Sequence, residues 1–562
     1  MINKIFKYTL AIVLFAFAMV ADAASEAEFK KLSKTWQLNA DGSQEFRYQM
    51  ELTLFTHTAM NSTYGESFIV YNPKYQDLKI NSSYTIQQDG TKVETPSNAF
   101  VEVLPKNAAG APAYNHLKEL VVVHTGLDLG ATIYLDYTLT SKAGYLPAID
   151  IFETLQQTSP VREYNLEIIV PENKRLVYQL SSPKAKLHKE SMNGMSTTSW
   201  TIRNVPASSK SDFVQIGNGD VPYLAATTFS SGKEALAFLY NQLDNSANSV
   251  LESLAQKLTK EESTIDGKVK SIWHYVNRQV VSNPLTIQQT GFRFRSAKSV
   301  LQTVYATRLE KLNLMVGLLN AVGIKAYPLA SYPVSVDKGL ALSAIDNFYF
   351  SVEGTPYLLS TNSMLPPVAV LSGFGMLKKM TDGEPFLIPE DKDYKIHGRY
   401  DISARPTGVE VKRSERVGKT LIPYFKKEVD EMSEENLLNA QNGYATFVLP
   451  ESHYGLATLP YGKLNSQRDM NISVPRVVDE EYTYTIKCDD GISACIPENT
   501  REISNSAGHM SMSVNKTDGA IVVKRRLQLY KQLYTPSEYK EFRTLLINWY
   551  DPHGKTLIFR LG

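Results

Sequence analysis

The chain has 562 residues, which is too long for one hydrophobic core, so two to four domains are expected. Its composition is that of an ordinary globular protein, with 43% hydrophobic and 21% charged residues. The formal net charge of +1 at pH 7 argues against a nucleic-acid partner and against any other strongly charged partner.

The first residues have the pattern of a secretion signal. Lys4 and Lys7 precede an apolar run from Leu10 to Val20, and Ala21-Asp22-Ala23 offers small residues to a signal peptidase. The run is too short to span a membrane, no later stretch reaches spanning length, and no Cys follows the run to carry a lipid. We therefore predict cleavage after residue 23 and a periplasmic or secreted protein with no transmembrane segment in the mature chain. Cleavage removes two of the 59 basic and one of the 58 acidic residues, leaving a net charge of zero.

Residues 24–228 are expected to form an N-terminal β-sandwich domain. Short runs of β-branched and aromatic residues recur there with few helical patterns, and turn signals such as Gln88-Asp89-Gly90-Thr91 separate them. Regularly spaced short strands are typical of a sandwich. The expected strands include 46–54, 67–71, 120–123, 131–137, 164–170 and 174–178.

Residues 229–390 are expected to form an α+β domain, because the periodicity becomes helical near Ser230. Helices are predicted over 233–259 and 265–280, followed later by strands at 347–352 and 356–360 that a Glu353-Gly354-Thr355 turn joins. Between them, residues 296–327 contain a helix with an apolar face that ends near Gly323 and a strand from Ile324. We expect this helix to be buried and the domain to pack on it.

Residues 391–562 are expected to form a C-terminal β-sandwich-like domain that ends in a helix and a strand. Strands are predicted at 400–411, 445–449, 481–487, 510–515, 520–529 and 556–561. Thr535-Pro536-Ser537-Glu538 has the form of a capping box and predicts that a helix begins there, with Thr535 as its N-cap.

The only two cysteines, Cys488 and Cys495, enclose a short loop. In an exported protein such a pair most often forms a disulfide, which we predict. The alternative is a reactive or metal-binding pair, but the spacing fits no zinc pattern and no His lies nearby.

No common catalytic or cofactor motif is present, and no cofactor or metal is expected. The sequence contains no H-E-x-x-H, Walker A, G-x-S-x-G or dinucleotide fingerprint. The nine His are scattered, and His274 is interpreted as structural. Arg293 and Arg295 alternate with Phe292 and Phe294, which indicates a half-buried strand or, alternatively, a surface contact.

Three segments of the middle region carry a family resemblance. Arg295-to-Leu301, Arg308-to-Lys311 and Leu318-to-Ala326 resemble the transglutaminase-like core of the papain-type cysteine enzymes. The segments Tyr71-to-Thr95, Val161-to-Tyr178 and Leu527-to-Trp549 resemble companion domains of unknown function that flank this core in Gram-negative envelope proteins. The resemblance implies two β-sandwich-like domains on either side of a papain-like α+β domain.

The resemblance also implies a Cys-His-Asp triad, but this sequence lacks it. The Cys position falls on Arg308, the His position on Asn347, and the Asp position on Ser360, which Thr361 follows. No Cys occurs before residue 488 and no His between residues 274 and 397, so a Cys–His pair cannot be built on these elements. An arginine stays protonated and is not a nucleophile.

Three interpretations of this degenerate site remain open. Arg308 points into solvent at a lost site; or Arg308, Asn347, Ser360 and Thr361 line a retained cleft that binds an anion, a glycan or a peptide carboxylate; or a new set of residues catalyses a reaction. Glu310 or Asp346 would compensate the charge of Arg308.

The resulting hypothesis is an exported, non-catalytic transglutaminase-like protein that acts in binding or assembly in the bacterial envelope, with a peptide, glycan or protein partner. One alternative is an enzyme of another class that processes glycans or peptides without the triad. The other is a structural partner of an envelope complex.

Overall fold

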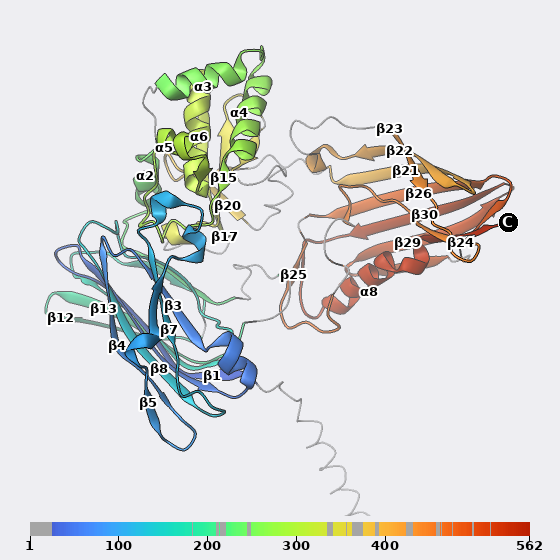
Figure 1. Cartoon of the computed structure of the whole chain (residues 1–562). Helices are drawn as coiled ribbons and strands as arrows, with labels where there is room; N and C mark the ends of the chain where they lie inside the picture. The colour runs from blue at the N-terminus through green and yellow to red at the C-terminus, as the bar shows by residue number, and fades with distance from the viewer. Residues whose placement is uncertain are drawn as a thin grey trace, which may run out of the picture.

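The protein is built from several β-sheets, a group of helices in the middle part and a further helix near the C-terminus, which Figure 1 shows in a computed structural model. The structure describes residues 25–562 except 183, 209–212, 214–220, 244–248, 334–340, 356, 362–374, 388–392, 423–430, 457–460, 462–463, 475, 497–499 and 518. The predicted β-rich, multidomain fold class is confirmed. The predicted signal peptide lies outside the described residues.

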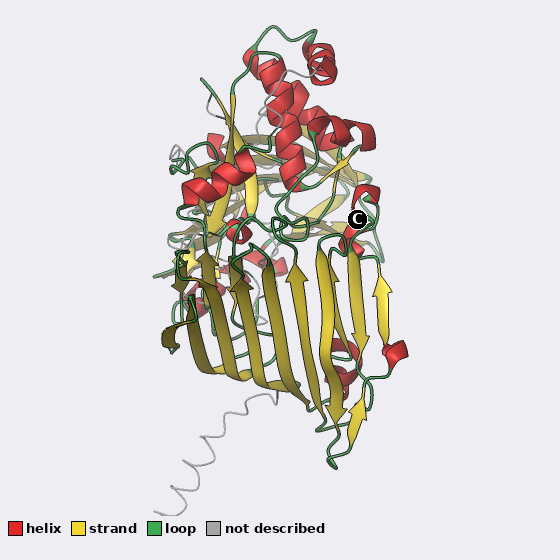
Figure 2. Cartoon of the chain, turned by 90° about the vertical axis from the view of Figure 1, so that its left-hand side faces the viewer, coloured by secondary structure: helices red, strands yellow, loops and turns green. Residues whose placement is uncertain are grey.

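An eight-stranded sheet dominates the N-terminal part, and its strands run side by side below the helices in Figure 2. Its strand order is β12-β13-β10-β1-β2-β8-β4-β5, and all neighbours are antiparallel except β1 and β10. The strands are β1 (Ala27–Leu38), β2 (Gln44–Leu54), β4 (Gln76–Ile86), β5 (Lys92–Glu94), β8 (Thr132–Ser141), β10 (Val161–Pro171), β12 (Lys186–Met192) and β13 (Met195–Val205).

Two three-stranded sheets pack against this large sheet and share one hydrophobic core with it. Leu52 and Leu166 come from the large sheet, Val122 and Leu224 from the smaller ones, and all four are fully buried. This layering is a sandwich. The first small sheet contains β3 (Glu66–Tyr71), β7 (Lys118–Val123) and β6 (Phe100–Val103), and the second contains β11 (Val177–Leu180), β14 (Tyr223–Thr227) and β9 (Asp150–Thr154).

Strand β14 belongs to two hydrophobic cores at once. Its alternate residues Leu224 and Ala226 lie in the N-terminal core, whereas Tyr223 and Ala225 lie in the core of the helical part. Successive side chains of a strand point to opposite faces, so a strand buried on both faces must be apolar throughout. The N-terminal sheets and the helical part are therefore packed together along β14.

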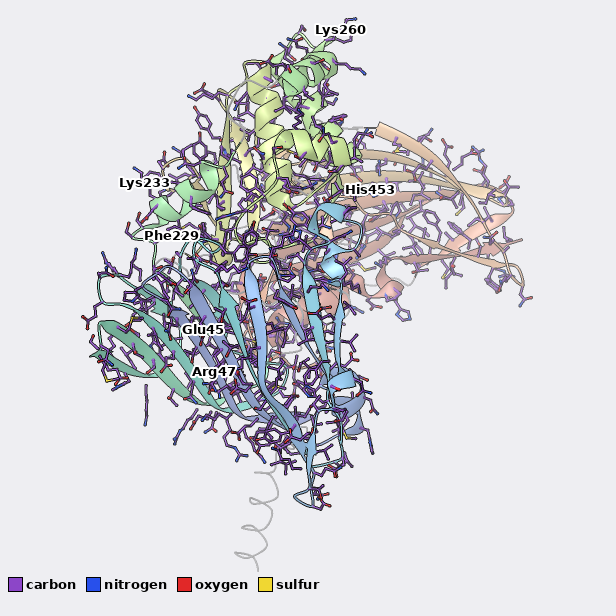
Figure 3. The ribbon with its side chains drawn as sticks, turned by 60° about the vertical axis from the view of Figure 1, so that its left-hand side comes forward. Glu45, Arg47, Phe229, Lys233, Lys260 and His453 are labelled. Atoms are coloured by element: carbon purple, nitrogen blue, oxygen red, sulfur yellow. The ribbon has the colours of Figure 1, made fainter. Side chains whose placement is uncertain are left out.

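The middle part combines helices with a four-stranded sheet of order β19-β18-β17-β20. Figure 3 places Phe229 and Lys233 where the chain passes from the N-terminal sheets into the helices, and Lys260 at their far end. The predicted helix over 233–259 is two helices in the structure. The elements are α2 (Gly232–Tyr240), α3 (Ser249–Thr259), α4 (Ile265–Gln279), β15 (Val281–Ser282), α5 (Ala297–Thr303), β16 (Tyr305–Ala306), α6 (Arg308–Ala321), β17 (Ala326–Pro333), β18 (Asn347–Val352), β19 (Leu358–Ser360) and β20 (Gly375–Lys379).

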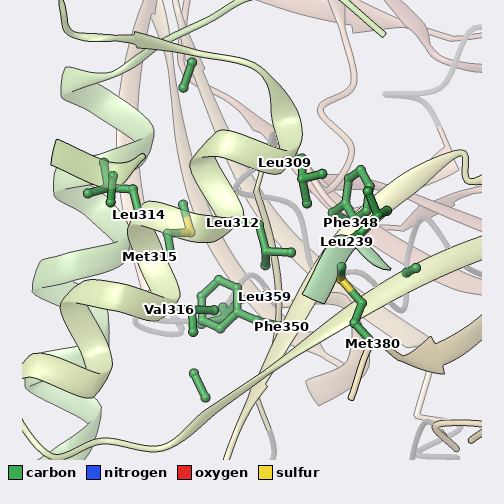
Figure 4. Close-up of a cluster of buried hydrophobic side chains, with 14 of the residues drawn as sticks. Leu239, Leu309, Leu312, Leu314, Met315, Val316, Phe348, Phe350, Leu359 and Met380 are labelled. Carbon is green, nitrogen blue, oxygen red and sulfur yellow. The ribbon is translucent and has the colours of Figure 1, made fainter. Parts of the chain in front are cut away.

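Helix α6 is the central helix of the middle part, as predicted. Every residue from Leu309 to Leu319 is buried, including Glu310, Lys311 and Asn313. Figure 4 shows Leu312 and Val316 of α6 beside Phe350 of β18 and Leu359 of β19. The predicted apolar face is therefore only part of what is buried, since the polar face of α6 is covered as well.

The C-terminal part has a seven-stranded sheet of order β23-β22-β21-β26-β30-β29-β28, with helix α8 (Tyr539–Tyr550) packed beside it (Figure 1). Its strands are β21 (Lys395–Arg405), β22 (Gly408–Val417), β23 (Glu431–Leu437), β26 (Val478–Cys488), β28 (Arg501–Asn505), β29 (Gly508–Thr517) and β30 (Ala520–Leu529). Two smaller sheets hold β24 (Tyr444–Val448), β32 (Thr556–Leu561) and β27 (Ile492–Cys495), and β25 (Ile472–Ser473) with β31 (Leu533–Tyr534).

The predicted capping box forms, but α8 begins later than predicted. Glu538 accepts a hydrogen bond from the backbone N–H of Thr535 at 3.0 Å, and Thr535 accepts one from the backbone N–H of Glu538 at 3.4 Å. These reciprocal bonds close a turn, and α8 starts only at Tyr539. The pattern therefore located the turn that leads into the helix.

The predicted disulfide is not formed in this structure, where Cys488 and Cys495 are both free. The strands that carry them join different sheets, because β26 pairs with β21 and β30 whereas β27 pairs with β32. The two cysteines therefore do not lie opposite each other on paired strands. Their oxidation remains a prediction.

Within the described part of the chain, no helix is both long and apolar enough to cross a membrane.

Candidate functional site

The candidate site lies where the N-terminus of α6 meets the start of β18. Thr307 is the N-cap of α6 and Arg308 its first residue. A guanidinium nitrogen of Arg308 donates a hydrogen bond to the backbone oxygen of Asp346, 2.8 Å away. The bond joins the head of the helix to the residue directly before β18.

Asn347, Ser360 and Thr361 lie at the same end of β18 and β19. Asn347 opens β18, and its amide nitrogen donates to the Tyr349 hydroxyl at 3.0 Å. Ser360 closes β19, and its backbone oxygen accepts a hydrogen bond from the indole of Trp273 at 3.0 Å. Thr361 is fully buried and donates to the backbone oxygen of Phe348 at 3.3 Å.

A cavity of about 270 Å³ opens beside Arg308, and we refer to it as the Arg308 cleft. Its lining includes Arg308 and Asp346, but not Asn347, Ser360 or Thr361. One of the three interpretations of the sequence placed all four residues in one cleft lining. The structure brings the four together at one end of the sheet, but only Arg308 reaches the cleft.

The charged side chains that line the cleft, among the described residues, are Arg293, Arg308 and Asp346. Arg293 also donates a hydrogen bond to the backbone oxygen of Gly144, 2.6 Å away. Loss of hydration raises the pKa of Asp346, and the nearby charge of Arg308 opposes this shift. With two guanidinium groups and one carboxylate, the cleft is suited to an anionic group.

A buried network beneath the cleft fixes the head of α6. The carboxylate of Glu310 is fully buried and is bound by Arg295 through Nε at 2.8 Å and a second nitrogen at 3.0 Å. It also accepts hydrogen bonds from the Tyr114 hydroxyl at 2.5 Å and from the backbone N–H of Thr307 at 2.8 Å. The Arg295 guanidinium lies 4.3 Å from the ring centroid of Tyr305.

This network corrects two expectations. Residues 292–295 form no strand, and Arg295 points into the ion pair with Glu310 and not to a surface. Glu310 does not neutralise Arg308 either, since its carboxylate is occupied by Arg295, Tyr114 and the helix cap. Asp346 is the residue that contacts Arg308. In the sequence, Thr307 and Glu310 stand three residues apart before an apolar run, which is the pattern of a capping box. This pattern could have predicted the N-cap of α6.

The N-terminal sheets also bind the segment that leads to Asp346 in the cleft lining. The Asp150 carboxylate of β9 accepts hydrogen bonds from the backbone N–H groups of Leu342 and Ser343, each 2.7 Å long. Burial raises the pKa of Asp150 to about 6, although these bonds stabilise the ionised form. Since the bonded segment leads directly to Asp346, the N-terminal part positions one side of the cleft.

No cluster of three or more His, Cys, Asp or Glu suited to a metal ion occurs among the residues that the structure describes.

Comparisons with known proteins identify the two ends of the chain as domains. Residues 40–209 match a Domain of Unknown Function with a solved structure, DUF3857, and residues 444–559 match a second one, DUF3858. A crystal structure of a candidate protease from Parabacteroides distasonis matches with 40% sequence identity over 95% of this chain and 99% of that chain, with a TM-score of 0.81. The chain belongs to the family of this Parabacteroides protein.

Two further solved structures are far less similar to this member of the family. A candidate cysteine protease from Cytophaga hutchinsonii shares 12% identity over 51% of this chain and 95% of that chain, with a TM-score of 0.21. An M1 zinc metallopeptidase from Deinococcus radiodurans shares 11% identity over 36% of this chain and 42% of that chain, with a TM-score of 0.18. No curated protein matches the chain.

Proposed function

We propose that this protein is an exported, non-catalytic member of the transglutaminase-like proteins that binds the carboxylate of a peptide in the Arg308 cleft. The observation that carries the proposal is the place of Arg308. It is the exposed first residue of the central helix, at the point where the resemblance places a nucleophilic Cys. Its guanidinium lines a cavity and cannot act as a nucleophile.

The order of the elements supports the transglutaminase-like part of this proposal. A papain-type core needs the head of a helix, the start of one strand and the end of the next strand close together. Here Arg308 contacts the residue before β18, and Ser360 at the end of β19 pairs with Tyr349 of β18. These contacts support the proposal that Arg308, Asn347 and Ser360 occupy the three triad positions with other residue types.

The charges of the cleft favour a carboxylate ligand. Arg293 and Arg308 outnumber Asp346 in the lining, and a guanidinium matches a carboxylate with two parallel hydrogen bonds. A cation at a helix N-terminus is mildly unfavourable, so binding an anion there would remove that repulsion as well. In the bacterial envelope, free peptide C-termini are carboxylates of this kind, which fits the predicted export of the chain.

Substitution of Arg308 is expected to abolish the preference of the cleft for a free carboxylate. The probe is a fluorescently labelled alanine-rich hexapeptide with a free C-terminus, compared by anisotropy with the same peptide amidated at its C-terminus. We expect the acid to bind at least about tenfold more tightly than the amide, because a charge-assisted hydrogen bond contributes roughly 1.5–3 kcal/mol. Arg308→Ala should erase this preference, and Arg308→Lys should restore only part of it.

Arg278→Ala is the matched control, since Arg278 is an exposed arginine of the same helical part that does not line the cleft. This control should bind like the unmodified protein. Equal affinity for acid and amide, or an undisturbed preference in Arg308→Ala, would contradict the proposal.

A second function is supported by one comparison. The Parabacteroides relative is described as a candidate protease, and at 40% identity a shared activity would be expected. Peptide hydrolysis by residues other than a Cys-His-Asp triad is therefore the alternative. A structural role in an envelope complex is compatible with the same cleft, with the carboxylate supplied by the partner protein.

A further inference from the structure

A second cavity, of about 260 Å³, lies between the N-terminal sheets and the middle part. We refer to it as the Gln44 cavity. Its floor is the end of the eight-stranded sheet, and its roof includes Gln288 and Phe292, which precede α5. Figure 3 labels Glu45, which lines the cavity, on the large sheet, and Phe229 where the chain passes into the helices.

The floor of the cavity is apolar and partly aromatic. Trp36 of β1 pairs with Phe46 of β2, and their rings lie 5.4 Å apart between centroids. Phe46 in turn pairs with Leu139 of β8, and all three residues line the cavity. Directly paired residues point to the same face of a sheet, so the three side chains form one continuous surface.

A row of polar side chains borders this floor at the end of the sheet, two residues from Phe46 on β2 and two residues from Leu139 on β8. Gln44 of β2 pairs with Ser141 of β8, which pairs with Gln76 of β4. The Gln76 side chain is satisfied, since its amide nitrogen donates to the Ser141 hydroxyl at 3.0 Å and its oxygen accepts from the backbone N–H of Asn72 at 2.9 Å. All three polar residues line the cavity.

Gln44 is the exception in this row. It is 7% exposed, and its amide nitrogen has no hydrogen-bond acceptor among the described residues. Burying an unpaired donor is unfavourable by the full cost of its desolvation, so such groups are usually satisfied by something bound nearby. Gln44 lines the cavity, and rotation of its terminal amide would turn this nitrogen toward an acceptor bound there.

We propose that the Gln44 cavity binds a neutral saccharide unit. Sugars present apolar C–H faces and rings of hydroxyl groups, and the cavity offers an aromatic floor edged by amides that both donate and accept. Its described lining contains no Lys or Arg, which argues against an anionic ligand. Two acidic residues, Glu45 and Asp150, also line it. Glu45 lies between Gln44 and Phe46 on β2, so its side chain points to the opposite face of the sheet. The Asp150 carboxylate already accepts two backbone hydrogen bonds.

The cavity is distinct from the Arg308 cleft, and this inference does not depend on the proposed function. Gln288 lines both spaces and donates a hydrogen bond to the backbone oxygen of Ser343 at 3.1 Å. Ser343 in turn donates to Asp150. One ligand that carries both a sugar and a carboxylate could therefore contact both spaces, but each space can be tested alone.

The test is titration of the full-length mature protein with neutral disaccharides, namely cellobiose, maltose and N,N′-diacetylchitobiose. Tryptophan fluorescence is the readout, because Trp36 lines the cavity whereas Trp200, Trp273 and Trp549 are buried. At least one disaccharide should change the emission saturably, and Trp36→Phe should remove the change.

Gln44→Leu separates a binding role from a structural one. We expect saccharide affinity to fall at least about tenfold while the melting temperature stays the same or rises, because the variant removes an unpaired buried donor. Gln49→Leu is the matched control on the same strand. Gln49 lies on the opposite face, donates to Asp136 at 2.9 Å and does not line the cavity, so this variant should keep saccharide affinity.

Three outcomes would overturn the proposal. The first is that none of the three disaccharides binds, and the second is that Gln44→Leu binds them as tightly as the unmodified protein. The third is saturable binding of choline in place of the sugars, which would identify a site for cations held by aromatic rings.

Discussion

Glu310→Ala is expected to lower the free energy of unfolding of the middle part by about 3–5 kcal/mol, the usual cost of removing one partner of a buried ion pair. The substitution leaves the Arg295 guanidinium largely buried without its bidentate partner. It also removes the acceptor of the Tyr114 hydroxyl and of the Thr307 backbone N–H. Urea unfolding followed by circular dichroism measures the loss.

Glu234→Ala is the matched control for this experiment. Glu234 lies in the first turn of α2 and accepts a hydrogen bond from the backbone N–H of Ser230 at 2.8 Å, but it is exposed. An exposed cap of this kind should contribute only about 0.5–2 kcal/mol. If both variants lower the free energy of unfolding by the same small amount, the buried contacts of Glu310 do not stabilise the middle part as the structure implies.

The effect of Glu310→Ala should also depend on pH. Burial raises the pKa of Glu310, but the hydrogen bonds and charge of Arg295 and the Tyr114 hydroxyl outweigh it, so the net pKa is lowered. A carboxyl group with a lowered folded-state pKa stabilises the fold fully above its unfolded pKa of about 4.3 and loses this contribution as the pH falls through the folded value. The difference between the unmodified protein and the variant should therefore shrink below about pH 4.

Arg525→Met is expected to destabilise the C-terminal part by a similar amount, about 3–5 kcal/mol. Arg525 is 3% exposed, forms an ion pair with Glu451, and donates to the backbone oxygen of Trp549 at 2.6 Å. Its guanidinium also lies 4.2 Å from the ring centroid of Trp549. The variant leaves the buried Glu451 carboxylate without its partner.

A double-mutant cycle distinguishes the loss of the pair from the burial of an unpaired charge. Glu451→Gln combined with Arg525→Met should recover a large part of the stability, because no unpaired charge remains. Urea unfolding of the two single variants and the double variant gives the coupling energy. Additive losses would show that the two residues act independently and would contradict the account of this pair.

The local patterns of the sequence predicted the elements near the site well. The heptad-like spacing of Leu312, Met315 and Leu319 predicted α6, and the β-rich runs predicted β18 and β19. These signals depend on neighbours within one or two turns, so they are readable from a single chain.

The contacts that support the site were not predictable in the same way. Arg295 and Glu310 are 15 residues apart, and Tyr114 comes from a segment 196 residues before Glu310. The chain has many Arg, Glu and Tyr side chains. The packing of separate sheets and helices decides which of them meet in a buried network. The same is true of Arg293 and Asp346 in the cleft, and of the two cysteines, whose strands entered different sheets.

We propose that the Arg308 cleft binds a peptide carboxylate and catalyses no reaction. The most direct test of this proposal is mass spectrometry of a library of glutamine-containing peptides, with and without a primary amine, after incubation with the mature protein. We predict that no peptide is deamidated, cross-linked or cleaved, while the carboxylate peptides still bind. Any such product that forms with the unmodified protein and is lost in Arg308→Ala would contradict the claim.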